Sequence, residues 1–184
     1  MSIYRVQPNI EKYKAFHLVD DDDNFDLQVE GYFDFMGQPK ANDWNGARVY
    51  LDATFDKAEL LVADITNFNV SALAYSEKAI SILQDVLEES GELLPFECDG
   101  KKWWIHNITN VLDALDKEET TMELMDSGRF MIGKTVLDEN KLTDVSVFKT
   151  KQRMTLLLSH DVAKNDYKTI IENSDLTGVI FSQK

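Results

Sequence analysis

The sequence predicts an α+β fold, in which a mixed, mostly antiparallel sheet is combined with two principal helices in a single domain. Two stretches near the start alternate apolar and polar residues, a pattern typical of half-buried strands. A later stretch places apolar residues at helical spacing, and several short apolar segments follow it. Hydrophobic residues make up 43% of the 184 residues, enough for a core without a metal or disulfide. This length favours one domain over residues 1–184.

The two alternating stretches are residues 26–35 and 48–56, and each predicts one strand. The outward positions of the first strand are strongly acidic, and Gly31 marks a bulge within it. The inward positions are apolar in both strands: Leu27, Val29, Phe33 and Phe35 in the first, and Val49, Leu51, Ala53 and Phe55 in the second.

The first principal helix is expected over Ser76–Ser90. Ser76 is a good N-cap, and Gly91 predicts a left-handed C-cap. A second helix is expected over His160–Asn173, capped by Ser159. The inward residues of the two helices are Ala79, Ile80, Leu83, Val86 and Leu87 in the first, and Ala163, Tyr167, Ile170 and Ile171 in the second.

The remaining apolar segments predict strands in the second half of the chain. The segment 103–106 is apolar on both faces, which indicates a covered central strand joined to its neighbour by the turn Asp99-Gly100. A short helical piece is expected over Val111–Leu115. The other strands are expected at residues 93–96, 129–132, 145–148, 154–158 and 177–181.

The charge balance points to a basic partner. Asp and Glu number 33 against 19 Lys and Arg, giving a formal net charge of −14. Such a surface repels nucleic acid and anionic membranes, because both are bound through Lys and Arg. It attracts basic proteins and speeds their encounter. The start of the chain lacks the apolar core of a signal peptide and no run has transmembrane length, so a cytoplasmic location is expected.

No motif predicts a catalytic residue, a metal or a cofactor, so the chain is not expected to be an enzyme. The run Asp20–Asn24 begins like an EF-hand loop, but Phe25 stands where glycine is required and Gly31 where the last ligand is required. An acidic turn is the favoured interpretation, with a partner contact and a calcium site as alternatives. The histidines His17, His106 and His160 are isolated from one another and from metal-binding partners in sequence.

Two other functions stay open at this point. A small hydrolase could use a carboxylate with His106 or His17 as acid–base groups. A homo-oligomeric scaffold or regulatory subunit, in the simplest case a homodimer, would instead present a large apolar patch on a two-fold axis.

Acidic residues gather in clusters that are candidate contacts for a basic partner. Residues 18–39 contain seven acidic residues and no basic one, and residues 79–100 contain six and none. The expected partner-binding residues are Asp22, Asp23, Asp26, Glu30 and Asp34, with Asp85, Glu88 and Glu89 as a second set.

Several motifs from Lys57 onward resemble a known family. They are Ser76-Glu77-Lys78-Ala79, Gly91-Glu92-Leu93-Leu94-Pro95, the block from Asn107 to Asp116, and Leu176-Thr177-Gly178 before Phe181. They resemble the eleventh immunity-protein family of bacterial polymorphic toxin systems. The resemblance covers residues 57–184 as a family-like core, whereas residues 1–56 match only loosely, through Trp44.

The resemblance implies a small cytoplasmic protein that binds a cognate toxin domain and blocks its active site or substrate channel. Many such toxins are nucleases, which need a basic surface for phosphate. An acidic inhibitor fits that surface, so the charge and the resemblance point the same way.

Overall fold

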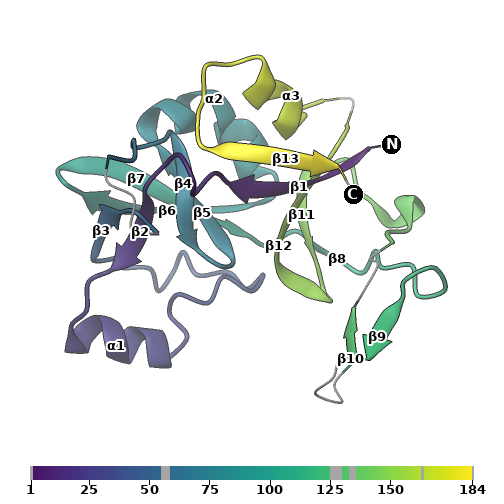
Figure 1. The fold of residues 1–184 in the computed structure, drawn as a ribbon, viewed down its shortest axis with the longest axis horizontal. Helices are drawn as coiled ribbons and strands as arrows, with labels where there is room; N and C mark the ends of the chain where they lie inside the picture. The colour runs from purple at the N-terminus through teal and green to yellow at the C-terminus, as the bar shows by residue number, and fades with distance from the viewer. Residues whose placement is uncertain (1, 55–58, 125–129, 133–135, 163, 184) are drawn as a thin grey trace.

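The chain forms two main β-sheets, two short β-ribbons and three α-helices in the residues that the structure, a computed structural model, describes (Figure 1). These residues are 2–54, 59–124, 130–132, 136–162 and 164–183. The α+β class with mostly antiparallel sheets is confirmed, since only one strand pair of the two main sheets is parallel.

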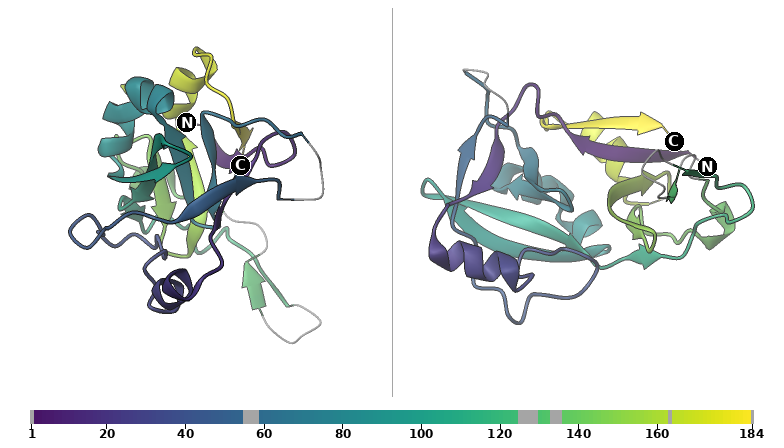
Figure 2. Two further views of the ribbon diagram at one scale, coloured as in Figure 1. Left: turned by 90° about the vertical axis from the view of Figure 1, so that its left-hand side faces the viewer. Right: turned by 60° about the horizontal axis from the view of Figure 1, so that its bottom comes forward.

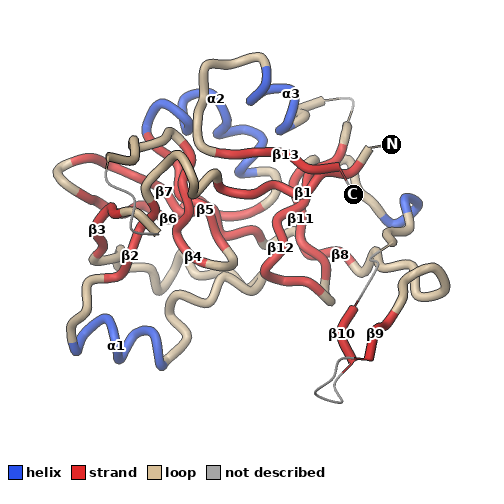
Figure 3. Tube along the Cα trace, viewed as in Figure 1, coloured by secondary structure: helices blue, strands red, loops and turns tan. Residues whose placement is uncertain are grey.

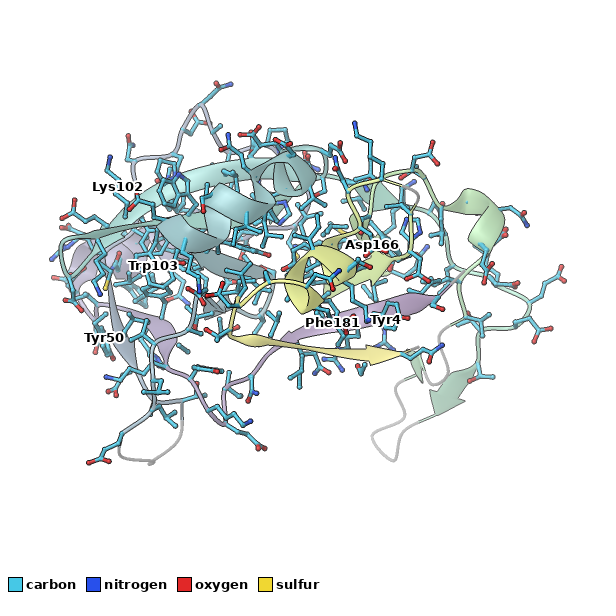
Figure 4. All side chains as sticks on the ribbon, turned by 90° about the horizontal axis from the view of Figure 1, so that it is seen from above. Tyr4, Tyr50, Lys102, Trp103, Asp166 and Phe181 are labelled. Atoms are coloured by element: carbon cyan, nitrogen blue, oxygen red, sulfur yellow. The ribbon has the colours of Figure 1, made fainter. Side chains whose placement is uncertain are left out.

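The larger sheet has five strands and joins the two ends of the chain. Its order is β13-β1-β12-β11-β8, with β8 and β11 parallel and the other pairs antiparallel. Tyr4 and Phe181, labelled in Figure 4, lie side by side on its strands β1 and β13, with ring centroids 6.5 Å apart. The strands are β1 (Ile3–Pro8), β8 (Val111–Leu112), β11 (Val147–Thr150), β12 (Arg153–His160) and β13 (Val179–Gln183).

The second sheet has four antiparallel strands in the order β4-β5-β7-β6. Its strands are β4 (Ile65–Asn69), β5 (Ala72–Ser76), β6 (Gly91–Cys98) and β7 (Lys101–Ile108). The predicted covered strand is confirmed in β7, which lies between β5 and β6. The two ribbons pair β2 (Ala15–Leu18) with β3 (Val49–Asp52), and β9 (Met122–Leu124) with β10 (Phe130–Ile132).

The helices lie on different sides of these sheets. Figure 3 shows α2 and α3 above the strands and α1 below them. No helix in the described part of the chain is both long and apolar enough to cross a membrane. The helices are α1 (Asp22–Val29), α2 (Glu77–Glu88) and α3 (Tyr167–Glu172), with a 3-10 turn at Glu139–Lys141.

The four-stranded sheet separates two hydrophobic cores, because alternate residues of a strand face opposite sides. On one face, α2 and α3 cover a core that also receives Val6 and Val147 from the five-stranded sheet. On the other face, the N-terminal third supplies the covering residues, among them Phe16, Phe33 and Phe35. The sheet itself contributes Leu73, Tyr75 and Ile108 to the first core and Ala74, Leu94 and Ile105 to the second.

The prediction of α2 is confirmed, but its predicted end is wrong. The Ser76 hydroxyl accepts the Ala79 N–H at 3.2 Å, and the predicted apolar stripe is buried. Gly91 does not form a left-handed cap; it begins β6, and the helix ends at Glu88 with Glu89 as a right-handed C-cap. A Cβ at Gly91 would lie 2.1 Å from the Asn107 carbonyl oxygen, so the close approach of β6 and β7 explains this glycine.

Three further predictions need correction. Residues 26–35 do not form a strand, since α1 and turns occupy them. The last helix is shorter than 160–173 and is capped by Asp166, because Ser159 and His160 continue β12. Residues 111–115 are not helical; β8 pairs with β11, and Leu115 bridges to Leu137.

The other predicted strands are confirmed within a few residues. The strand predicted at 48–56 is β3, and the end of that range, 55–58, lies outside the described residues. The strand predicted at 129–132 is β10, with Arg129 outside the described residues, as is Ala163 of the last helix. Tyr167 and Ile171 are buried as predicted.

Gly178 is required where β13 meets β4. Its φ is +117°, and a Cβ there would lie 1.7 Å from the Ile65 carbonyl oxygen. We expect Gly178→Ala to lower the free energy of unfolding by at least about 3 kcal/mol in urea titrations, because backbone must move to admit the methyl group. The matched control is Gly100→Ala, since Gly100 has φ +70° but open space around it, and it should cost only about 1–2 kcal/mol. Equal losses for both variants would show that the Ile65 contact is unimportant.

Candidate partner-binding face

Helix α1 forms because its first turn is stabilised by acidic residues. The Asp21 carboxylate accepts the Asn24 N–H at 2.9 Å, which caps the helix. Asp22 and Asp23 lie in the first turn, where negative charge interacts favourably with the helix dipole. The run that suggested an acidic turn is therefore a helix start. Among the described residues, no group of three or more His, Cys, Asp or Glu side chains could hold a metal ion.

A buried asparagine fixes α1 to the body of the protein. The Asn24 side chain is 3% exposed, and its amide donates to the carbonyl oxygens of Val19 and Arg48 at 2.8 and 3.0 Å. Leu27 packs against the second core from the same side of the helix. These contacts determine which face of α1 points outward.

The outward face of α1 is apolar at its centre and acidic around it. Phe25 and Val29 are 64% and 71% exposed and lie one turn apart on the helix. Asp22 and Asp26 flank them at helical spacing, and Glu30 caps the C-terminal end. Exposed large hydrophobic side chains next to one another are typical of an interaction surface. We call Asp22, Phe25, Asp26, Val29 and Glu30 the α1 face.

Some acidic residues of this region form ion pairs and others do not. Arg48 contacts Asp21 at 2.9 Å and Asp23 at 3.3 Å. In the part of the chain that the structure describes, no ion pair involves Asp22, Asp26, Glu30 or Asp34. All four are exposed. Their charge is therefore available to a basic partner, whereas that of Asp23 is compensated in part.

The second candidate set lies on α2, away from the first. Figure 2 shows α1 and α2 on opposite sides of the molecule, and they adjoin different cores of the four-stranded sheet. Asp85, Glu88 and Glu89 are exposed, but Glu89 accepts the Asn165 amide at 2.6 Å and Glu88 accepts the Gln84 amide at 2.9 Å. The two sets form separate surfaces.

Two other acidic residues, one of them in the second predicted cluster, have structural contacts. The Glu92 carboxylate accepts the Lys40 N–H at 2.8 Å and the Asn107 amide at 3.0 Å. The Gln152 amide, which donates to the Asp113 carboxylate at 3.0 Å, lowers the pKa of this carboxyl, and Lys151 at 3.6 Å adds to the effect.

The histidines do not support the hydrolase alternative. His106 is 1% exposed, and its Nε2 lies 3.0 Å from the Leu87 carbonyl oxygen and 3.1 Å from the Ser90 hydroxyl. Burial lowers the pKa of His106 to about 3, with a smaller contribution from Lys149. His17 stacks on Tyr50, with ring centroids 5.5 Å apart. A sealed, neutral His106 is a core residue rather than an acid–base catalyst.

The comparison with known families covers the second half of the chain. The model of the Imm11 immunity protein family matches residues 93–183. The resemblance found in the sequence motifs is thereby confirmed over this range, which runs from β6 to β13. No curated protein matches the chain.

The Imm11 match supports an immunity-protein role and favours a non-enzymatic function. Residues 57–92, which also resembled the family, lie outside the matched range, as does α1. The α1 face therefore belongs to the part of the chain that the family model does not cover.

Sequence reasoning missed the apolar half of the α1 face. The alternating pattern placed Val29 inside a strand, and Phe25 was notable in the sequence only as a departure from the EF-hand pattern. The available signal was the capping pair Asp21 and Asn24, three residues apart, with two acidic residues between them.

The neutral state of His106 predicts an acid-sensitive fold. The unfolded chain binds a proton at His106 near pH 6.5, whereas the folded chain does so only near pH 3. The free energy of unfolding should therefore fall as the pH drops through this window, by up to about 1.4 kcal/mol per pH unit. Urea titrations measure this slope, and His106→Gln should reduce it. An NMR imidazole signal of His106 that titrates near pH 6.5 in the folded protein would contradict the assignment.

Proposed function

We propose that this protein is an immunity protein that neutralises a cognate toxin domain by binding its basic surface through the α1 face. The Imm11 match is the observation that supports the role. The exposure of Phe25 and Val29 among uncompensated carboxylates supports the location. Binding would cover the active site or substrate channel of the toxin. A cytoplasmic location, a single domain over residues 1–184 and a homodimer stay predictions.

Charge supports the choice of partner. A net charge of −14 steers a basic protein toward this one at long range. A nuclease is a strong candidate for the toxin, because it must hold a basic surface against phosphate to work. An acidic protein that occupies this surface competes directly with the nucleic acid.

The α1 face has the composition of a protein interface. Tight interfaces combine a desolvated apolar centre with a polar rim, and a few central residues supply most of the binding energy. Phe25 and Val29 can form such a centre, and Asp22, Asp26 and Glu30 can form the rim. The charges would then govern association, and the apolar pair would govern dissociation.

The deciding experiment uses the toxin domain encoded by the neighbouring gene. Expression of that domain alone should arrest growth, and co-expression of the full chain should restore growth and yield a complex on purification. Failure of both rescue and co-purification would overturn the proposal. A self-associating chain without a toxin complex would favour the scaffold alternative.

Charge removal from the α1 face should slow association with that toxin. We expect the triple variant Asp22→Asn, Asp26→Asn, Glu30→Gln to lower the association rate constant roughly three- to tenfold at low salt and to flatten its salt dependence. Stopped-flow or surface-binding kinetics measure both. The matched control is Asp85→Asn, Glu88→Gln, Glu89→Gln on α2, which removes the same charge from the other side. A larger effect from the control triple would move the interface to α2.

Truncation of the apolar centre should speed dissociation without unfolding the protein. Phe25→Ala with Val29→Ala should raise the dissociation rate constant at least about 30-fold, as expected for central interface residues. The free energy of unfolding should change by less than about 0.5 kcal/mol, because both side chains are exposed. Val70→Ala is the control, since Val70 is 79% exposed at the β4–β5 turn. Dissociation kinetics unchanged by the double variant would remove α1 from the interface.

A further inference from the structure

A groove of about 890 Å³ adjoins α1 on the side opposite its exposed face. One wall comes from α1 and the segment after it, through Leu27, Tyr32 and Trp44. The other wall comes from β6 and β7 of the four-stranded sheet, through Pro95 and Trp104. Lys102, labelled in Figure 4, also lines the groove near the start of β7. The groove thus joins the N-terminal part of the chain to the Imm11-like part.

The aromatic wall is held in place before any partner arrives. The rings of Tyr32 and Trp44 stack in parallel, with centroids 5.0 Å apart and an interplanar angle of 5°. The Trp44 indole N–H donates to the Pro95 carbonyl oxygen at 2.7 Å, and the Asn45 N–H donates to the Tyr32 hydroxyl at 2.5 Å. A site whose side chains are already fixed loses little conformational entropy on binding.

The segment that carries Trp44 is also tied to the sheet at its start. The Asn107 amide, on β7, donates to the Gln38 carbonyl oxygen at 2.8 Å. The Glu92 carboxylate, on β6, accepts the Lys40 N–H at 2.8 Å. The groove therefore has walls that are fixed to one another at both ends of residues 38–44.

The charges along the groove compensate one another. Asp23 and Arg48 both line it and lie 3.3 Å apart. Glu97 and Lys102 also line it and are directly opposite each other on β6 and β7. No ion pair joins these two among the described residues, but their charges are opposite, so the four charged residues of the lining sum to zero. A groove of aromatic walls and balanced charge suits an uncharged apolar side chain better than a cation.

The edge of β6 favours insertion of a side chain over addition of a strand. β6 is the edge of its sheet, and Pro95 in its middle has no N–H to offer an added strand. The Pro95 carbonyl oxygen is already bonded to Trp44. Pairing along this edge is therefore blocked at its centre.

We propose that the groove receives an aromatic or large aliphatic side chain that projects from the toxin. This rests on the proposed function for the identity of the partner. Asn24 and Leu27 of α1 line the groove, so the same helix borders the groove on its inner side and carries the α1 face on its outer side. The partner then supplies basic residues to the α1 face and one uncharged anchor to the groove, where its burial stabilises the complex most.

The test uses the isolated full chain and three capped tripeptides with glycine at both ends and phenylalanine, arginine or glycine in the middle. Indole N–H signals are followed by NMR, with assignments from Trp44→Phe and Trp104→Phe. The phenylalanine peptide should shift Trp44 and Trp104 with a dissociation constant of roughly 1–10 mM. Trp103 is 3% exposed in the second core and serves as the internal control that should not move.

Two variants complete the test. Trp104→Leu should abolish the shift of the Trp44 signal, whereas Tyr50→Leu, which removes an exposed aromatic ring outside the groove, should leave it unchanged. The proposal is wrong if the arginine peptide shifts the signals more than the phenylalanine peptide, or if no peptide shifts them. Toxin binding without peptide binding would refute the groove alone, and peptide binding without a toxin complex would refute the proposed function alone.

Discussion

The ammonium group of Lys149 connects the parts of the molecule on which the candidate site depends. Its Nζ donates to the carbonyl oxygens of Phe35 and Ser71, the latter at 2.7 Å. Lys149 belongs to β11 of the five-stranded sheet, Ser71 to the turn between β4 and β5, and Phe35 to the segment after α1. The side chain is fully buried, and this burial lowers the pKa of Lys149 to about 8. A buried lysine is tolerated only where oxygen atoms replace its water, so these three segments must meet there.

This requirement explains why the N-terminal third is not a loose addition to the Imm11-like half. Phe35 is fully buried in the second core, and Lys149 holds its carbonyl group from the other sheet. Because Phe35 is fixed, Tyr32 and Trp44 can form a rigid wall beside β6. Helix α1 can then pack against the rest of the protein through Asn24 and Leu27. The acidic residues of α1 remain outside, exposed to solvent. The α1 face therefore belongs to an N-terminal segment whose position is fixed by buried contacts with the two main sheets.

The sequence predicted elements that are determined by neighbouring residues. It did not predict features that depend on contacts between distant segments. Helix α2 was predictable because Ser76 and the apolar stripe lie within one short stretch and bury one face. The strand predicted at residues 26–35 was wrong. Leu27 and Val29 fit an alternating pattern, but in the helix Leu27 points inward and Val29 points outward. The acidic candidate residues could be found from the composition. That they lie on two separate faces, on α1 and on α2, follows only from the topology of the fold. Lys149 could not be found, since its two acceptors lie 114 and 78 residues away in the sequence.

The Imm11 match covers only part of the proposed binding surface. The matched residues 93–183 include the sheet strands that frame the groove on one side, with Pro95 and Trp104. The α1 face and the stacked pair of Tyr32 and Trp44 lie before residue 93, outside the match. Specificity is a difference in affinity between partners, and a few central residues can set it. Substitutions on the α1 face can therefore change the affinity for a partner while the buried contacts of Asn107 and Lys149, which place the N-terminal segment, are left intact.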